Sequence, residues 1–154
     1  MSRASDIVTA YLNQTKIDLV ESYVEKGLKA SGKYEKGLKV HVEDSGSRIR
    51  ARIESEGHVY YMEKGRRPNK QQTAKQARFL GKILEQWVKD KGIDVNPYAA
   101  AWKIVREGIQ VPNRYNPGDV VTEVITDEWF DKLIEKLSTW HIQVVQSEVS
   151  KIFK

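Results

Sequence analysis

The chain has 154 residues, of which 40% are hydrophobic and 31% charged, the ordinary composition of one globular domain. It contains no cysteine, which excludes disulfides and thiolate-bound metals, and no apolar run approaches the roughly 18 residues of a membrane span. The formal net charge of +5 is only mildly basic. We therefore expect a single domain over residues 1–154 that has no membrane partner.

The first third of the chain predicts a helix followed by a hairpin. Residues 5 to 30 carry apolar side chains at helical spacing, with Ser5 placed to cap the start and Gly32 just past the end. In residues 37 to 55, apolar and charged side chains alternate on both sides of the turn sequence Asp44-Ser45-Gly46-Ser47. Each strand then has one apolar and one charged face, as in a half-buried antiparallel pair.

The middle of the chain predicts a short segment and two helices. Residues 58 to 63 are expected to be extended or irregular before a basic turn at Gly65-Arg66-Arg67-Pro68. A helix over residues 73–91 has the apolar stripe Phe79, Leu80, Ile83, Leu84, Trp87 and Val88. The next helix runs from Asn96-Pro97, a cap followed by proline, to Gly108. Its inward side chains are expected to be Ala100, Ala101, Ile104 and Val105.

The last third predicts a loop, a strand and a long helix. The loop, residues 111–118, is expected to be flexible, and residues 119–125 are expected to form a strand. Thr126 caps a helix to about residue 153, whose stripe includes Phe130, Leu133, Leu137, Val144, Val145 and Ile152. Hairpin strands and separate helices together predict an α+β fold with an N-terminal helix, an antiparallel hairpin, further short strands, two middle helices and a long C-terminal helix.

The search for catalytic chemistry gives no candidate. His41, His58 and His141 lie on different predicted elements, and no metal-ligand spacing, nucleophile elbow or phosphate-binding loop is present. His141 lies near the apolar stripe of the last helix, which favours a packed, hydrogen-bonded core histidine. We therefore expect no catalytic, cofactor or metal site, and a protein that is not an enzyme.

The distribution of charge is more informative than its sum. Residues 61–91 hold nine basic and three acidic side chains, a net charge of +6, whereas residues 119–154 hold seven acidic and four basic ones, a net charge of −3. A phosphate-facing patch is one interpretation, centred on Arg66, Arg67 and Lys70. Head-to-tail packing of identical subunits, basic region against acidic end, is another. A patchily charged, solvated surface is the third.

The predicted second strand carries a row of arginines, Arg48, Arg50 and Arg52, on one face. This row is compatible with contact to DNA, with pairing to Glu43 across the hairpin or to the acids of a neighbour, and with a charged strand that discourages aggregation. The two structural interpretations are favoured over DNA contact. All six arginines and lysines named in these two paragraphs are candidate subunit or DNA contacts.

Aromatic side chains are candidate anchors. Tyr60 and Tyr61 precede the basic turn, where aromatic rings between arginines are able to stack on bases. In an extended segment they would point to opposite faces, so at least one is expected in the core. Trp87, Trp102, Trp129 and Trp140 all fall on predicted helices, where core or subunit-interface anchoring is favoured.

The stretch Tyr60-Tyr61-Met62-Glu63-Lys64-Gly65-Arg66-Arg67-Pro68 resembles a signature of the head-to-tail joining, or tail-completion, family of tailed bacteriophages. In that family the segment follows an N-terminal helix and a hairpin. A helix with Trp and Lys-Gly comes next, here Trp87 to Gly92, and then a helix ending in Ile-x-x-x-Gly-Ile, here Ile104 to Ile109. The resemblance covers the order of elements over nearly the whole chain. The segment from Pro112 to Ile125 departs from the pattern by its length.

The resemblance implies a structural virion protein without catalytic residues, assembled in the host cytoplasm. Such proteins form homo-oligomeric rings in the neck, between the portal and the tail tube. The implied partners are further copies of the chain, the portal or adaptor protein, the tail-tube protein and double-stranded DNA in the lumen. The hairpin and the loops around Arg66 and Pro112 would then be candidates for contacts between subunits.

A nucleic-acid-binding module that works as a free protein is the alternative. It would use the basic region 64–78 as a phosphate track, with Arg66, Arg67, Lys70, Lys75 and Arg78. The sequence has no recognisable helix-turn-helix, zinc finger or RNA-binding aromatic motif, which favours the structural role.

Overall fold

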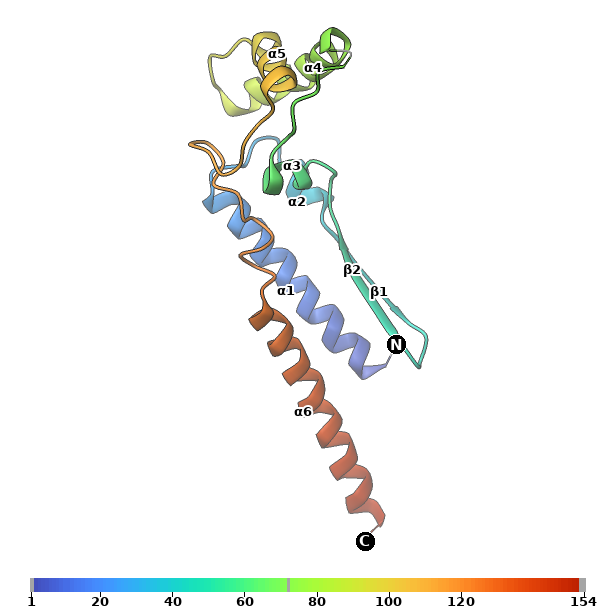
Figure 1. The fold of residues 1–154 in the computed structure, drawn as a ribbon. Coiled ribbons are helices and arrows are strands. Elements are labelled where there is room, and N and C mark those ends of the chain that lie inside the picture. The colour runs from blue at the N-terminus through green and yellow to red at the C-terminus, as the bar shows by residue number, and fades with distance from the viewer. Residues whose placement is uncertain (1, 72, 153–154) are drawn as a thin grey trace.

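The computed structural model describes residues 2–71 and 73–152 and has the α+β fold that the sequence predicts. An N-terminal helix, an antiparallel hairpin, middle helices and a long C-terminal helix follow one another in the expected order (Figure 1). The elements are α1 (Arg3–Glu25), α2 (Lys33–Gly37), β1 (Lys39–Asp44), β2 (Ile49–Glu54), α3 (Val59–Lys64), α4 (Thr73–Lys91), α5 (Pro97–Glu107) and α6 (Asp127–Ile152).

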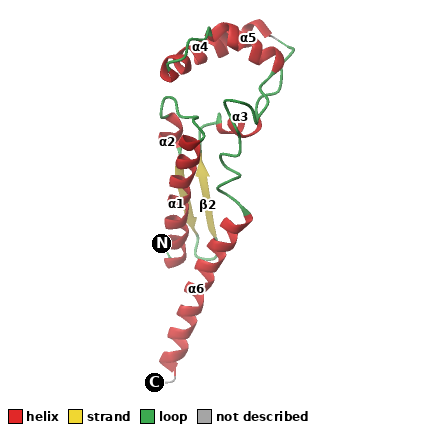
Figure 2. Cartoon of the chain, turned by 90° about the vertical axis from the view of Figure 1, so that its left-hand side faces the viewer, coloured by secondary structure: helices red, strands yellow, loops and turns green. Residues whose placement is uncertain are grey.

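The lower part of the molecule, here called the body (residues 2–64 and 110–140), is built around α1. The hairpin lies along one side of this helix and the first half of α6 along another (Figures 1 and 2). In the hairpin Val40 lies opposite Ile53 and Val42 opposite Ala51, so the apolar positions of the two strands share one face. That face covers α1, and the charged face is left outside.

The core of the body lies where the end of α1 meets α2 and the turn before α6. It consists of buried Leu19, Tyr23, Tyr34, Leu38 and Val120. The rings of Tyr23 and Tyr34 pack with centroids 4.4 Å apart. Burial raises the pKa of Tyr34 to about 12.

The upper part, here called the helical lobe (residues 69–107), is a hairpin of two helices that contact mainly each other (Figure 1). Its buried side chains are small: Ala77 and Gly81 on α4, Ala101 and Val105 on α5. A Cβ at Gly81 would come within 2.3 Å of the Tyr98 ring, so the glycine lets the two helices approach closely. Asn96 caps α5 and Pro97 opens it, as predicted.

Two chain segments that cross at a pair of glycines join the lobe to the body. Arg66 and Ile109 exchange both backbone hydrogen bonds, at 2.8 and 2.7 Å. Gly65 and Gly108 both have φ near +75°, and a Cβ at Gly65 would lie 2.1 Å from the Ile109 carbonyl oxygen. The crossing therefore requires glycine for its backbone conformation and for its close approach.

Three local predictions were wrong. Helix α1 begins at Arg3, capped by the Ser2 side chain, and ends at Glu25 before left-handed Gly27, rather than extending from residue 5 to residue 30. Residues 59–64 form helix α3 and not an extended segment. Within the described chain this segment has no strand partner, so its backbone is satisfied by local bonds such as Met62 N to His58 O.

The strand expected over residues 119–125 is a series of turns. The amides of Val124 and Ile125 donate to the Val121 carbonyl, and the Glu63 carboxylate accepts from the amides of Val121 and Thr122. Burial raises the pKa of Glu63, but these hydrogen bonds and that from the Thr122 hydroxyl outweigh it, so its pKa is lowered. The hydrogen bonds accepted by Glu63, which is far away in the sequence, thus override the strand preference of the β-branched residues in this segment.

Candidate interaction surfaces

The charged face of the hairpin is solvent-exposed and carries the predicted arginine row. The Arg52 guanidinium and the His41 ring each lie 3.0 Å from a different carboxylate oxygen of Glu54. Arg50 is in register with Glu43, and Arg48 is exposed at the turn. Within the described chain the sheet has only these two strands, so both of its edges are free.

The structure separates the residues of the predicted basic turn. Arg66 is half-buried in the glycine crossing, with its guanidinium carbon 5.9 Å from the centroid of the Tyr61 ring. Arg67 and Lys70 are exposed on the path to α4. The hairpin arginines belong to the body, whereas Arg67 and Lys70 lead into the lobe, so the predicted contacts do not form one patch.

Four of the six candidate aromatic anchors, Tyr60, Tyr61, Trp87 and Trp102, are on the surface and not in the core. Tyr60 is 66% exposed and Tyr61 52% exposed, because α3 is a single short helix that presents both rings outward. The expectation that one of them packs into the core was therefore wrong. Trp87 and Trp102 are also exposed, on α4 and α5. Their role as interface anchors stays a prediction.

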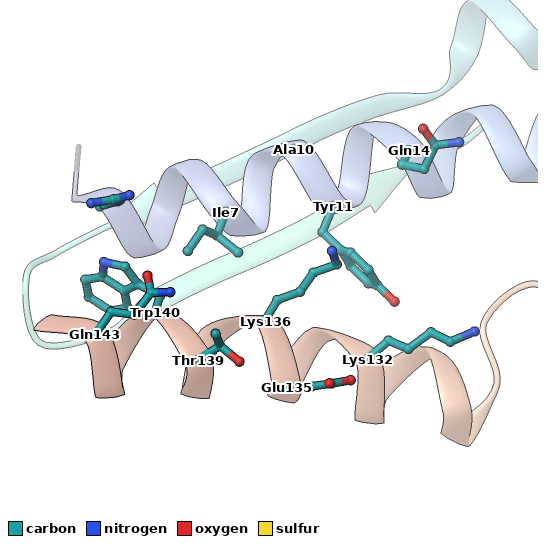
Figure 3. A pocket seen from close by; sticks show the side chains of 11 residues that line it. Ile7, Ala10, Tyr11, Gln14, Lys132, Glu135, Lys136, Thr139, Trp140 and Gln143 are labelled. Carbon is teal, nitrogen blue, oxygen red and sulfur yellow. The ribbon is translucent and has the colours of Figure 1, made fainter. Parts of the chain in front are cut away.

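A groove of about 800 Å³ lies between α1 and α6 (Figure 3). Tyr11 lines this groove and its hydroxyl donates to the Trp129 carbonyl, while the Trp129 Nε1 donates to Thr15 Oγ1, both at 2.8 Å. Apolar atoms of Ile7 and Trp140 line it further along, and charged Lys132 and Lys136 extend from α6. The lining thus combines apolar and charged side chains from the two helices.

Several positions of the predicted apolar stripes are exposed. On α4 these are Phe79, which is 70% exposed, and Ile83; on α6 they are Phe130, Val144 and Val145. His141 is also exposed, so its assignment as a core histidine was wrong. The apolar periodicity predicted both helices correctly, but within the described residues the chain provides only one packing neighbour for each.

The C-terminal half of α6 projects from the molecule. It continues past the hairpin turn and the start of α1 (Figure 2). Every side chain from residue 141 to residue 151 is exposed, including Ile142 and Val149. Isolated helices of this length are marginal in water, so packing against another molecule would stabilise it.

The described residues contain no cluster of three or more His, Asp or Glu side chains able to hold a metal ion. None of the helices in that part of the chain combines the length and apolar character of a membrane span. The lowered pKa of Asp44 comes mainly from hydrogen bonds donated by Ser2, which tie the hairpin to the start of α1.

No family model, curated protein or solved structure matches the chain.

Proposed function

We propose that the chain is a structural subunit of the neck of a tailed-phage virion, where it forms part of the ring that joins the head to the tail. The observation that carries the proposal is that a single copy leaves apolar side chains exposed at both of its ends, on the helical lobe and on the projecting half of α6. The resemblance of Tyr60 to Pro68 and of the order of elements to head-to-tail joining proteins supports it.

Exposed apolar faces at two opposite ends favour assembly into a closed ring over a simple dimer. A two-fold dimer uses one self-complementary patch, whereas contacts between two different patches repeat from copy to copy and close into a ring where the rotation between copies allows closure. Covering an exposed Phe or Ile contributes about 1.5–3 kcal/mol for each side chain. A neighbouring copy could bury a large apolar area, because four apolar side chains are each more than half exposed: Phe79, Ile83, Ile134 and Ile142.

On this proposal the partners are further copies of the chain, the portal or adaptor protein on one side and the tail-tube protein on the other. The arginine row of the hairpin and the exposed Arg67 and Lys70 are the side chains available to these partners or to DNA in the lumen. The free edges of β1 and β2 offer a second mode of contact, by addition of a strand.

One observation favours the alternative, a free nucleic-acid-binding module. Among the described residues, Arg67, Lys70, Lys75 and Arg78 have no ion-pair partner and are all exposed. Arg66, however, is held in the glycine crossing, and α4 presents an apolar row beside its basic one. The exposed apolar side chains of Phe79 and Ile83 do not bind phosphates, so the ring subunit is preferred.

The test is light scattering over a concentration series, combined with negative-stain imaging of the protein alone, with portal and with tail tube. Rings of uniform diameter, or a ring added to the end of the portal or tube, support the neck assignment. A monomer that ignores both partners, yet binds DNA with an affinity that falls steeply with salt, would overturn it in favour of the nucleic-acid module.

A further inference from the structure

The outward face of α4 combines an apolar row with a basic row. Phe79, Ile83 and Trp87 follow one another at intervals of four residues and are all exposed. Beside them run Lys75, Arg78 and Lys82, also exposed. None of the three bases has an ion-pair partner among the residues that the structure describes. Like charges at this spacing repel one another along the helix, so acidic side chains of a partner would stabilise the basic row.

The outward face of α6 combines an apolar row with an acidic one. Ile134, Ile142, Val145 and Val149 recur at helical spacing and are exposed, Ile134 by 60%. In the first turns of the helix, Asp127, Asp131 and Glu135 repeat at intervals of four residues. These three acids are exposed and, in the described part of the chain, make no ion pair. The uncompensated charge here is opposite in sign to that of α4.

The two faces cannot meet within one molecule. The helical lobe and the projecting half of α6 lie at opposite ends of the molecule in both views (Figures 1 and 2). Their composition is matched, because each has exposed apolar side chains beside three unpaired charges at nearly the same spacing. Opposite charges across an interface select the partner and fix its orientation, while the apolar rows provide most of the affinity.

We propose that the outward face of α4 in one copy docks on the outward face of α6 in the next copy. This rests on the proposed ring function and deepens it by naming the two surfaces that repeat around the ring. The contact is heterologous, since each copy offers α4 to one neighbour and α6 to the other. It also explains why α6 retains an apolar row although every side chain from residue 141 to residue 151 is exposed.

Proximity of the two faces is testable because the chain has no cysteine of its own. One batch carries Ile83→Cys and a size-distinguishing tag, the other carries Ile142→Cys, and the mixture is treated with a short bismaleimide. The matched control replaces Ile83→Cys by Ser47→Cys, an exposed hairpin position. We expect more mixed adduct from positions 83 and 142 than from positions 47 and 142.

Charge reversal then tests the pairing itself. Arg78→Glu with Lys82→Glu makes α4 acidic, and Asp131→Lys with Glu135→Lys makes α6 basic. Each variant alone places like charges across the contact and is expected to associate on the order of tenfold more weakly. In an equal mixture, every contact between the two different variants has complementary faces, so assembly in which the variants alternate is expected to recover. Lys33→Glu with Lys36→Glu, two exposed bases on α2, gives the same change of charge elsewhere.

The outcomes separate the two proposals. Preferred 83–142 adducts with recovery in the mixture support the contact between α4 and α6. Rings that form equally well from either variant alone overturn this contact and leave the ring function standing. If the wild-type chain forms no ring with or without portal and tube, and positions 83 and 142 give no more adduct than the control, both proposals are overturned. A preferred adduct without any ring supports the contact and overturns the ring.

Discussion

The body of the molecule buries large side chains, whereas the helical lobe buries almost none. Leu19, Tyr23 and Tyr34 fill the core of the body, where α1, α2 and the turn before α6 converge. In the lobe, two helices meet through Ala77, Gly81 and Ala101, and their larger side chains face outward. The body is therefore expected to hold most of the folding free energy, and the lobe to be an attachment surface carried on a glycine crossing. Four predictions test this comparison.

The largest effect is expected in the core of the body. Tyr34→Ala should lower the free energy of unfolding by about 3–5 kcal/mol, because it leaves a cavity at a residue that is 1% exposed. Within the part of the chain that the structure describes, the buried Tyr34 hydroxyl has no hydrogen-bond partner, so Tyr34→Phe should be neutral or stabilising. Urea unfolding measures both. A Tyr34→Ala variant as stable as wild type would mean that the core lies elsewhere.

The second effect concerns the joint between the two regions. Gly65→Ala should cost about 2–3 kcal/mol, since it forces alanine into a left-handed conformation and brings its Cβ against the Ile109 carbonyl. Gly46→Ala is the matched control, because Gly46 also has positive φ but faces open space. It should cost about 1 kcal/mol. In the Gly65→Ala variant, hydrogen exchange should show the first loss of amide protection at Arg66 and Ile109. An equal loss of stability in the Gly65→Ala and Gly46→Ala variants would contradict the close crossing.

The third effect depends on pH. Glu63→Gln should lower stability at pH 7 by about 1 kcal/mol, since a neutral amide accepts more weakly from the Val121 and Thr122 amides. The pKa of Glu63 is lowered in the folded protein, so its contribution is present above the unfolded pKa of about 4.3 and is lost as pH falls toward the folded value. Urea midpoints of wild type and variant should therefore converge in acid. A constant difference from pH 7 to pH 3 would exclude this role.

The smallest effect on stability is expected at the outward face of the lobe. Phe79→Ser should change the free energy of unfolding of the monomer by no more than about 0.5 kcal/mol, because the ring is 70% exposed. The same change should reduce assembly measured by light scattering. Ala77→Ser, at a buried position two residues earlier and on the side of α4 that contacts α5, is the contrasting variant and should destabilise the lobe. Marked unfolding in Phe79→Ser would place that ring inside the fold.

Much of the fold follows from local sequence signals. The alternation around Asp44 to Ser47, the cap and proline at Asn96-Pro97 and the cap at Thr126 each act through neighbouring backbone atoms, and the predicted elements form there. The segments for which the prediction was wrong depend on residues that are distant in the sequence. The turns over residues 119–125 are held by Glu63, and α3 is helical because the structure described gives it no strand to pair with.

The sequence by itself determined where the long helices and the hairpin lie, because capping residues and apolar periodicity act over a few positions. It also determined the imbalance between a basic middle and an acidic end, since charge is fixed by residue type. Only the tertiary structure decided which side of each apolar helix is covered. Periodicity marks the apolar face of a helix, but only the packing of α4 on α5 and of α6 on α1 shows which part of that face is covered and which part is exposed.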